Sequence, residues 1–198
     1  GKVHMLGHEF RYIPHRAAIG RAIAEGLIGE PRAASFIQFL PHIPNWEHAM
    51  PDWWFDPAEG GGWLGASMPH LADQLLGWLG PVQSLSASLN ATSLTRGPVD
   101  DTFSLRFATT GGVEGVIQYC AGLFGPMLDI SHVTGSEGSV WLDASGENLR
   151  AQKIYDRAGY TLEGRLRDHW YRPTLGRNVD VMLYGLLRDD WTRMKAGL

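Results

Sequence analysis

The chain has 198 residues, of which 44% are hydrophobic and 19% charged, and its formal net charge at pH 7 is −4. This composition is typical of a globular domain with a sizeable core and excludes a disordered chain. Its arginines and lysines are scattered rather than clustered, so we expect neither nucleic acid nor an anionic membrane as a partner.

The single cysteine, Cys120, excludes an internal disulfide framework and indicates a cytoplasmic location. It lies in an apolar, strand-like segment, which favours a core thiol over a nucleophile. No apolar run approaches the length of a membrane span, and the first residues contain no signal-peptide core. The apolar residues Val3 and Met5 predict that the chain begins with a strand, and no initiator methionine precedes it. We therefore expect one domain, residues 1–198, cut from a longer protein.

The first half of the chain predicts two helices separated by a strand and a long loop. Pro14 suits the first turn of a helix that continues to about Gly26, and residues 33–43 predict a strand. The loop that follows contains three tryptophans, and loops of this length are typically functional. A second helix is predicted from Ser67, as N-cap, to Leu79.

From residue 82 onward the pattern changes to strands. Short turns separate the five strand-like segments, which predicts an antiparallel meander; the segments are residues 82–94, 100–109, 113–122, 127–136 and 138–144. Residues 149–172 predict weak strands and loops, and residues 179–198 have helical spacing. The fold class is therefore α+β, a large open, mostly antiparallel sheet with helices packed on one face. The open face indicates a homo-oligomer.

Candidate chemistry is concentrated in residues 60–73, GGGWLGASMPHLAD. The glycines allow the backbone to approach a ligand closely. A helix beyond them would present His70 and Asp73 on one side, opposite its apolar positions. Near the helix N-terminus the dipole favours a neutral imidazole that helps to hold an anion or an oxygen-rich ligand. A histidine that is merely hydrogen-bonded within the fold is the alternative that this spacing leaves open.

The same glycines formally match the dinucleotide fingerprint GxGxxG, but their context excludes that interpretation. The fingerprint requires a buried strand before the first glycine and an acidic residue at the end of the next strand. Residues 56–59 read Asp-Pro-Ala-Glu, and no carboxylate follows at the required distance. The histidines form no compact ligand motif, so no metal site is expected.

Three segments, residues 7–32, 51–85 and 135–143, together resemble the C-terminal domain of the Gfo/Idh/MocA family of oxidoreductases. The middle segment is the most specific, with its glycine run, histidine, aspartate and Trp-Leu-Gly-Pro ending. Members of this family join an N-terminal Rossmann domain, which binds NAD or NADP and supplies a lysine in a Glu-Lys-Pro motif, to a C-terminal domain that shapes the substrate pocket and the subunit interface. No lysine here lies in that motif, so the resemblance implies that the Rossmann domain is not part of this chain.

The resemblance also implies roles for individual residues. His70 matches the family's active-site histidine, which contacts or deprotonates the reacting hydroxyl, a task that suits imidazole. Asp73 matches an aspartate that we interpret as a structural partner first and a substrate ligand second. Arg11 matches a position that often faces the pocket, with a surface ion pair as an equal alternative. The family's aspartate four residues before the histidine is replaced by Ala66, so either the substrate differs or another group compensates.

Trp53 and Trp54 complete the predicted substrate-binding residues, because an aromatic ring can stack on a sugar or close a pocket. Core packing is the alternative for one of the two. We expect a substrate-binding and oligomerisation domain of an NAD(P)-dependent oxidoreductase acting on a sugar, polyol or related hydroxy compound. NAD or NADP would bind the full-length protein and not this domain alone. The alternatives are a non-catalytic carbohydrate-binding or scaffolding module and, with less support, a hydrolase or lyase using His70 with Asp73.

Overall fold

A computed structural model describes residues 2–40, 50–92, 98–122, 128–143, 160–172 and 176–187, together with Lys153, Asp156 and Arg193. The two α-helices within these ranges are α1 (Pro14–Ala24) and α3 (Trp63–Leu79). The strands are β1 (Pro31–Phe39), β2 (Val82–Asn90), β3 (Thr102–Thr109), β4 (Glu114–Cys120), β5 (Leu128–Gly135), β6 (Gly138–Asp143), β7 (Thr161–Arg172) and β8 (Arg177–Leu187).

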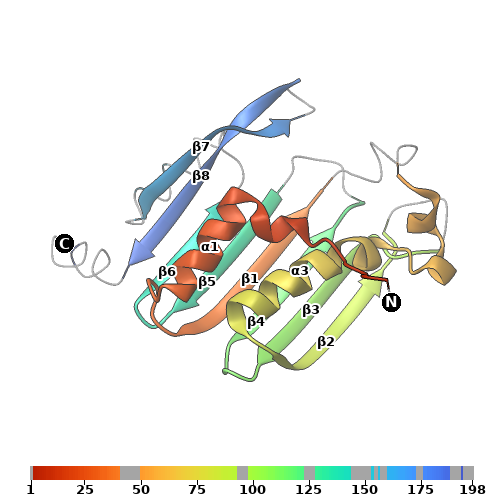
Figure 1. Ribbon diagram of the computed structural model, residues 1–198, viewed down its shortest axis with the longest axis horizontal. Helices are drawn as coiled ribbons and strands as arrows, with labels where there is room; N and C mark the ends of the chain where they lie inside the picture. The colour runs from red at the N-terminus through yellow and green to blue at the C-terminus, as the bar shows by residue number, and fades with distance from the viewer. Residues whose placement is uncertain are drawn as a thin grey trace.

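The described strands form one sheet in the order β2-β3-β4-β1-β5-β6-β8-β7. Both α-helices lie side by side on the same face of this sheet (Figure 1). Strand β1 lies between β4 and β5, parallel to the former and antiparallel to the latter, whereas the other neighbouring pairs are antiparallel. The predicted α+β class with a mostly antiparallel open sheet is confirmed, but β1 interrupts the expected meander.

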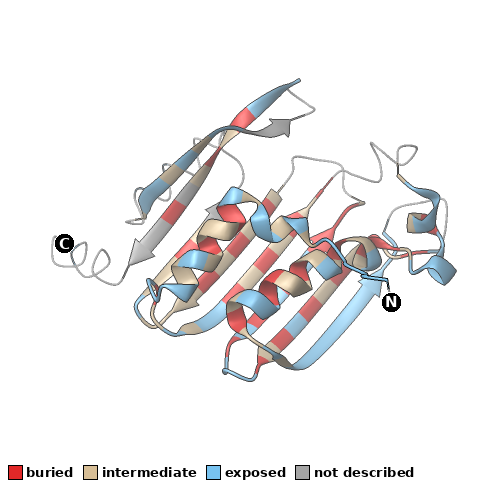
Figure 2. Cartoon of the chain, viewed as in Figure 1, coloured by how far each residue is buried: buried red, intermediate tan, exposed pale blue. Residues whose placement is uncertain are grey.

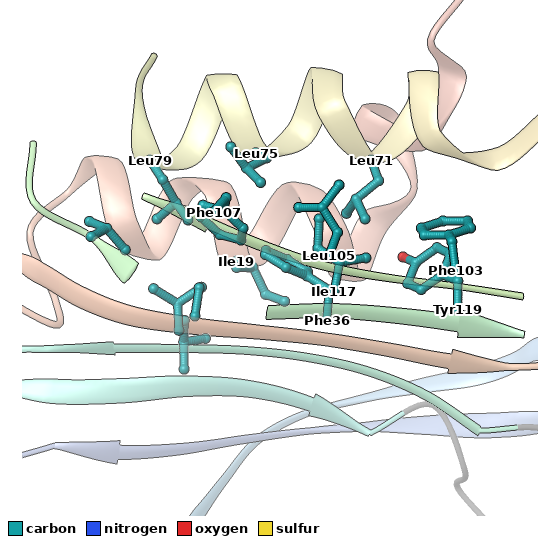
Figure 3. Close-up of a cluster of buried hydrophobic side chains, with 14 of the residues drawn as sticks. Ile19, Phe36, Leu71, Leu75, Leu79, Phe103, Leu105, Phe107, Ile117 and Tyr119 are labelled. Atoms are coloured by element: carbon teal, nitrogen blue, oxygen red, sulfur yellow. The ribbon is translucent and has the colours of Figure 1, made fainter. Parts of the chain in front are cut away.

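The core forms between α3 and the middle of the sheet (Figure 3). Leucines at positions 71, 75 and 79 recur every turn of α3 and are buried. On β3, Phe103, Leu105 and Phe107 alternate with more exposed residues and face the helix layer, which gives the striped burial pattern in Figure 2. The apolar side that the sequence predicted for α3 is therefore the side that packs on the sheet.

The start of α3 differs from the prediction. The helix begins at Trp63 and includes Pro69, while Ser67 is buried and its hydroxyl donates to the Trp63 carbonyl oxygen at 2.6 Å instead of capping the helix. Asp100 stabilises the helix start, since the Leu64 N–H donates to its carboxylate at 2.8 Å. Burial raises the pKa of Asp100 above its ordinary value. A cap supplied from 36 residues away has no signal in the local sequence.

Two further expectations about the chain ends were wrong. Residues 2–8 form no strand, and Val3 is 98% exposed. Residues 179–187, predicted as the first part of a helix, belong to β8. Val179 and Val181 are buried with a less buried residue between them, which is the two-residue period of a strand. Of the remaining predicted helix, residues 188–198, only Arg193 lies within the described residues.

Cys120 is buried, as predicted for a core thiol. None of the helices in the described ranges has the combined length and apolar character that a membrane crossing requires.

Candidate active site

The outward side of α3 brings three of the predicted site residues together. A short 3₁₀-helix, η1 (Glu9–Tyr12), packs against α3 and carries Arg11 to Asp73. The Arg11 Nε donates to Asp73 Oδ2 at 2.7 Å, and the terminal Nη2 donates to Oδ1. This forked pair joins residues 62 positions apart, while His70 lies one turn before Asp73 on the same helix.

The contact between Arg11 and Asp73 stabilises the charged form of each side chain. Hydrogen bonding from Arg11 lowers the pKa of the Asp73 carboxyl below its ordinary value, and this effect outweighs the opposing one of burial. The same contact raises the pKa of Arg11. The side chain of Asp73 is 11% exposed and that of Arg11 50% exposed. Asp73 is thus an ionised carboxylate held by Arg11.

This pair predicts a pH dependence of stability. Because the folded state lowers the pKa of Asp73 from 3.8, its contribution is complete above that value and is lost as the pH falls below it. In urea unfolding measured from neutral to acidic pH, the advantage of the wild type over Asp73→Asn should therefore shrink below about pH 4. Arg11→Met should remove the same pH-dependent part, and the double variant should remove no more. An advantage that stays constant down to acidic pH would contradict the pairing.

His70 is neither sealed in the core nor fully open. Its ring stacks on Phe10, with 4.2 Å between centroids and 21° between planes, and meets the edge of His8 at 5.8 Å. Its Nδ1 is buried, makes no hydrogen bond within the described part of the chain, and lies 3.7 Å from the Glu9 carboxylate. The side chain is 23% exposed, so the exposed portion belongs to the other ring atoms. That portion can meet a ligand.

A buried polar cluster that the sequence analysis missed lies beneath this region. Arg16 of α1 donates to the Gln74 amide oxygen at 2.9 Å and to Asp129 Oδ2 at 3.1 Å. Gln38 also donates to Asp129, and the Gln74 Nε2 donates to the His70 carbonyl oxygen at 3.1 Å. The sequence signals this cluster only by a polar residue between apolar neighbours, Asp129 between Leu128 and Ile130.

Gly61, Gly62 and Gly65 lie close against other parts of the chain, whereas a Cβ on Gly60 would meet no atom within 4 Å. A Cβ on Gly61 would lie 2.4 Å from the Trp53 carbonyl oxygen, and one on Gly62 would meet the Asp100 carboxylate. Gly62 also has a φ of 100°, which favours glycine. A carboxylate beside this turn opposes an anionic pyrophosphate, so these residues do not fit a dinucleotide.

The two predicted tryptophans differ in burial. Trp54 packs partly buried on the core, with its ring 5.5 Å from that of Trp63, whereas Trp53 is 40% exposed. Both belong to a 3₁₀-helix, η3 (Asp52–Phe55), near the start of α3. His70 lies about two helical turns beyond Trp63. Packing is therefore the observed role of Trp54, and Trp53 has the more accessible ring.

Clusters of three or more metal-binding side chains were not found within the described ranges. The described residues form an α+β domain with a partly exposed histidine, His70, beside the Arg11–Asp73 ion pair on α3. The chain belongs to the Gfo/Idh/MocA family, since residues 17–141 match the model of the GFO/IDH/MocA C-terminal domain.

The relatives that the chain matches are longer than the chain itself. An uncharacterized oxidoreductase of Synechocystis is 26% identical over 139 residues, which are 70% of this chain and 37% of that protein. WlbA dehydrogenase from Bordetella pertussis, in complex with NADH and UDP-GlcNAcA, has a TM-score of 0.61 at 22% identity, covering 69% of this chain and 39% of its own. Levoglucosan dehydrogenase, in complex with NADH and levoglucosan, gives 0.61 at 22% identity, covering 73% and 41%. The structural likeness shows the fold, and the chain spans about two fifths of the length of these relatives.

Proposed function

We propose that this chain is the substrate-binding and oligomerisation domain of an NAD(P)-dependent oxidoreductase that acts on a sugar, polyol or related hydroxy compound. The observation that carries the proposal is the placement of His70 on the outward side of α3, partly exposed and beside the Arg11–Asp73 pair. Family membership supports it, as do the hydroxyl-rich ligands named for the WlbA and levoglucosan dehydrogenases.

His70 would accept the proton of the reacting hydroxyl through Nε2, the ring nitrogen other than the buried Nδ1. That role requires the hydrogen of the neutral ring to lie on Nδ1, where Glu9 Oε2 is 3.7 Å away. A small approach of the Glu9 carboxylate would stabilise the imidazolium that forms. Glu9 therefore offers the compensating charge at a site where Ala66 replaces the family's aspartate. NAD or NADP, held by a Rossmann domain outside this chain, would supply the hydride acceptor.

Arg11, beside His70, and Trp53, near the start of α3, are the proposed substrate contacts. Asp73 engages the Nε and Nη2 edge of the half-exposed guanidinium, and Arg11 would offer its Nη1 to a hydroxyl or an anionic group. The accessible ring of Trp53 suits the C–H face of a sugar. Trp54, by its packing, would support Trp53 through their edge contact at 5.9 Å.

The sheet face opposite α1 and α3 supports the oligomerisation part of the proposal. No helix of the described residues covers it (Figure 1). Val116 projects there, between the inward-facing Gly115 and Ile117, and is 46% exposed. A second copy of the chain would bury this face. We place the complete protein in the cytoplasm.

A direct test of this division of labour is calorimetric titration of the 198-residue chain with NADH and with NADPH. We expect no saturable binding up to about 1 mM nucleotide, which corresponds to a binding free energy of only about 4 kcal/mol. The reason is that Gly61 and Gly62 pack against Trp53 and Asp100, and the Asp100 carboxylate beside them opposes an anionic pyrophosphate. Micromolar binding of either nucleotide would contradict the proposal.

A non-catalytic carbohydrate-binding module is the second candidate, favoured by the exposed ring of Trp53. Such a module needs the aromatic surface but has no use for an imidazole that exchanges protons. Replacement of His70 in the complete protein separates the two functions, because only catalysis requires the imidazole.

A further inference from the structure

We propose that Arg16 is a positioning residue for His70. Its buried guanidinium contacts Gln74 and Phe10, and these two residues hold the backbone and the ring of His70. The consequence for catalysis rests on the proposed function, whereas the positional claim concerns contacts within the chain and is testable without any substrate.

The first route from Arg16 to His70 runs through α3. Arg16 Nη1 donates to the Gln74 side-chain oxygen at 2.9 Å, and the Gln74 Nε2 donates to the His70 carbonyl oxygen at 3.1 Å. In an α-helix this carbonyl pairs with the N–H of residue 74, so the side chain adds a second donor to the same turn. Gln74 is buried, and its amide cannot readily exchange Arg16 for water.

The second route runs through Phe10, on which the imidazole is stacked. The Arg16 guanidinium carbon lies 5.3 Å from the centre of the Phe10 ring, within the range of a cation–π contact. Phe10 in turn stacks on His70 at 4.2 Å. The guanidinium therefore contacts the ring that supports the imidazole as well as the amide that holds its backbone.

Asp129 anchors Arg16 to the sheet. The ion pair is 3.1 Å long, both side chains are 4% exposed, and Gln38 of β1 donates to the same carboxylate oxygen at 3.3 Å. Strand β5, which carries Asp129, lies next to β1 in the sheet. The position of His70 is thus tied to two neighbouring strands through one guanidinium.

The composition of the cluster favours positioning over simple stabilisation. Arg16 Nε and Asp129 Oδ1 are both buried and have no hydrogen-bond partner within the described ranges. A buried ion pair with unused polar atoms is a poor way to gain stability, because apolar side chains of similar volume often stabilise as well or better. The Arg16 guanidinium, however, is planar and has several donors, so it can contact Gln74, Asp129 and Phe10 at the same time.

The test is the two-bond ¹H–¹⁵N correlation spectrum of the histidine rings in the 198-residue chain, with His70 assigned from its loss in His70→Gln. In Arg16→Met we expect the His70 ring signals to lose the upfield shift that stacking on Phe10 imposes. Gln74→Met should displace them less, because it removes one of the two routes. Arg16→Lys, which keeps the charge, should restore part of the wild-type position.

Asp101→Asn is the matched control. Asp101 is another fully buried carboxylate, bonded to Thr92 and Thr102, and its loss should destabilise the fold without moving the His70 signals. A folded Arg16→Met chain with unmoved His70 signals would overturn the proposal, as would equal shifts in Asp101→Asn. If Arg16→Met does not fold, unmoved signals in Gln74→Met are the overturning result. A normal turnover after replacement of His70 would contradict the proposed function. It would not bear on the claim that Arg16 positions His70, which the spectra test separately.

Discussion

Replacing Arg16 by methionine should lower the free energy of unfolding by about 3 to 5 kcal/mol, measured by urea denaturation at neutral pH. Arg16 and Asp129 are both 4% exposed, so removal of the guanidinium leaves a buried carboxyl group without its partner. The loss also frees the Gln74 amide oxygen from its donor in a site without access to water.

The exposed ion pair between Arg106 and Glu114 provides the matched control. Its contact distance is 2.8 Å, but the side chains are 69% and 64% exposed. Arg106→Met should therefore cost at most about 1 kcal/mol. The double replacement Arg16→Met with Asp129→Leu should recover much of the stability, because it removes both charges. If Arg16→Met and Arg106→Met lowered the free energy of unfolding by the same amount, the predicted large contribution of the buried Arg16–Asp129 pair would be contradicted.

The sequence predicted the part of the fold that depends on local periodicity. Leu71, Leu75 and Leu79 mark the buried side of α3, and alternation on β3 marks the face that packs against it. These patterns are set by 3.6-residue and two-residue repeats and do not depend on distant segments. The open, mostly antiparallel sheet with helices on one face followed from them.

Features that depend on distant segments were missed or misplaced. The pairing of β1 with β4 and β5 is decided by the whole sheet, since the alternation of β1 suits several positions equally. In residues 179–187, Val181, Tyr184 and Leu187 fit a helical period, but the pairing of this segment with β6 and β7 makes it a strand. Asp100 follows β2 in the sequence and hydrogen-bonds the start of α3 from 36 residues away. Local cap preferences could not detect this contact and pointed to Ser67 instead.

The candidate site shows the same division. His70 and Asp73 were placed on one side of a helix from their spacing, and Arg11 from the family resemblance. That Arg11 and Asp73 bond to each other was not predictable, because the contact closes 62 residues of chain. Arg16 and Asp129 are separated by 113 residues, and neither has a motif.

Replacing His70 by alanine in the complete oxidoreductase should lower kcat by about 10²- to 10⁴-fold, the usual contribution of a positioned general base. Its exposed portion lies on α3 beside the Arg11–Asp73 pair, where a hydroxyl could reach it. KM should change much less, because the proposed substrate contacts, Arg11 and Trp53, remain in this variant. Leu76→Ala, at an exposed position of the same helix, should leave kcat near the wild-type value.

The most direct test of the account is therefore the turnover of the His70→Ala oxidoreductase at saturating hydroxy substrate and saturating nucleotide. We predict at least a 100-fold loss relative to the wild type, with Leu76→Ala unaffected. A His70→Ala enzyme that turns over at the wild-type rate would contradict the assignment of this helix to the reacting side of the substrate pocket.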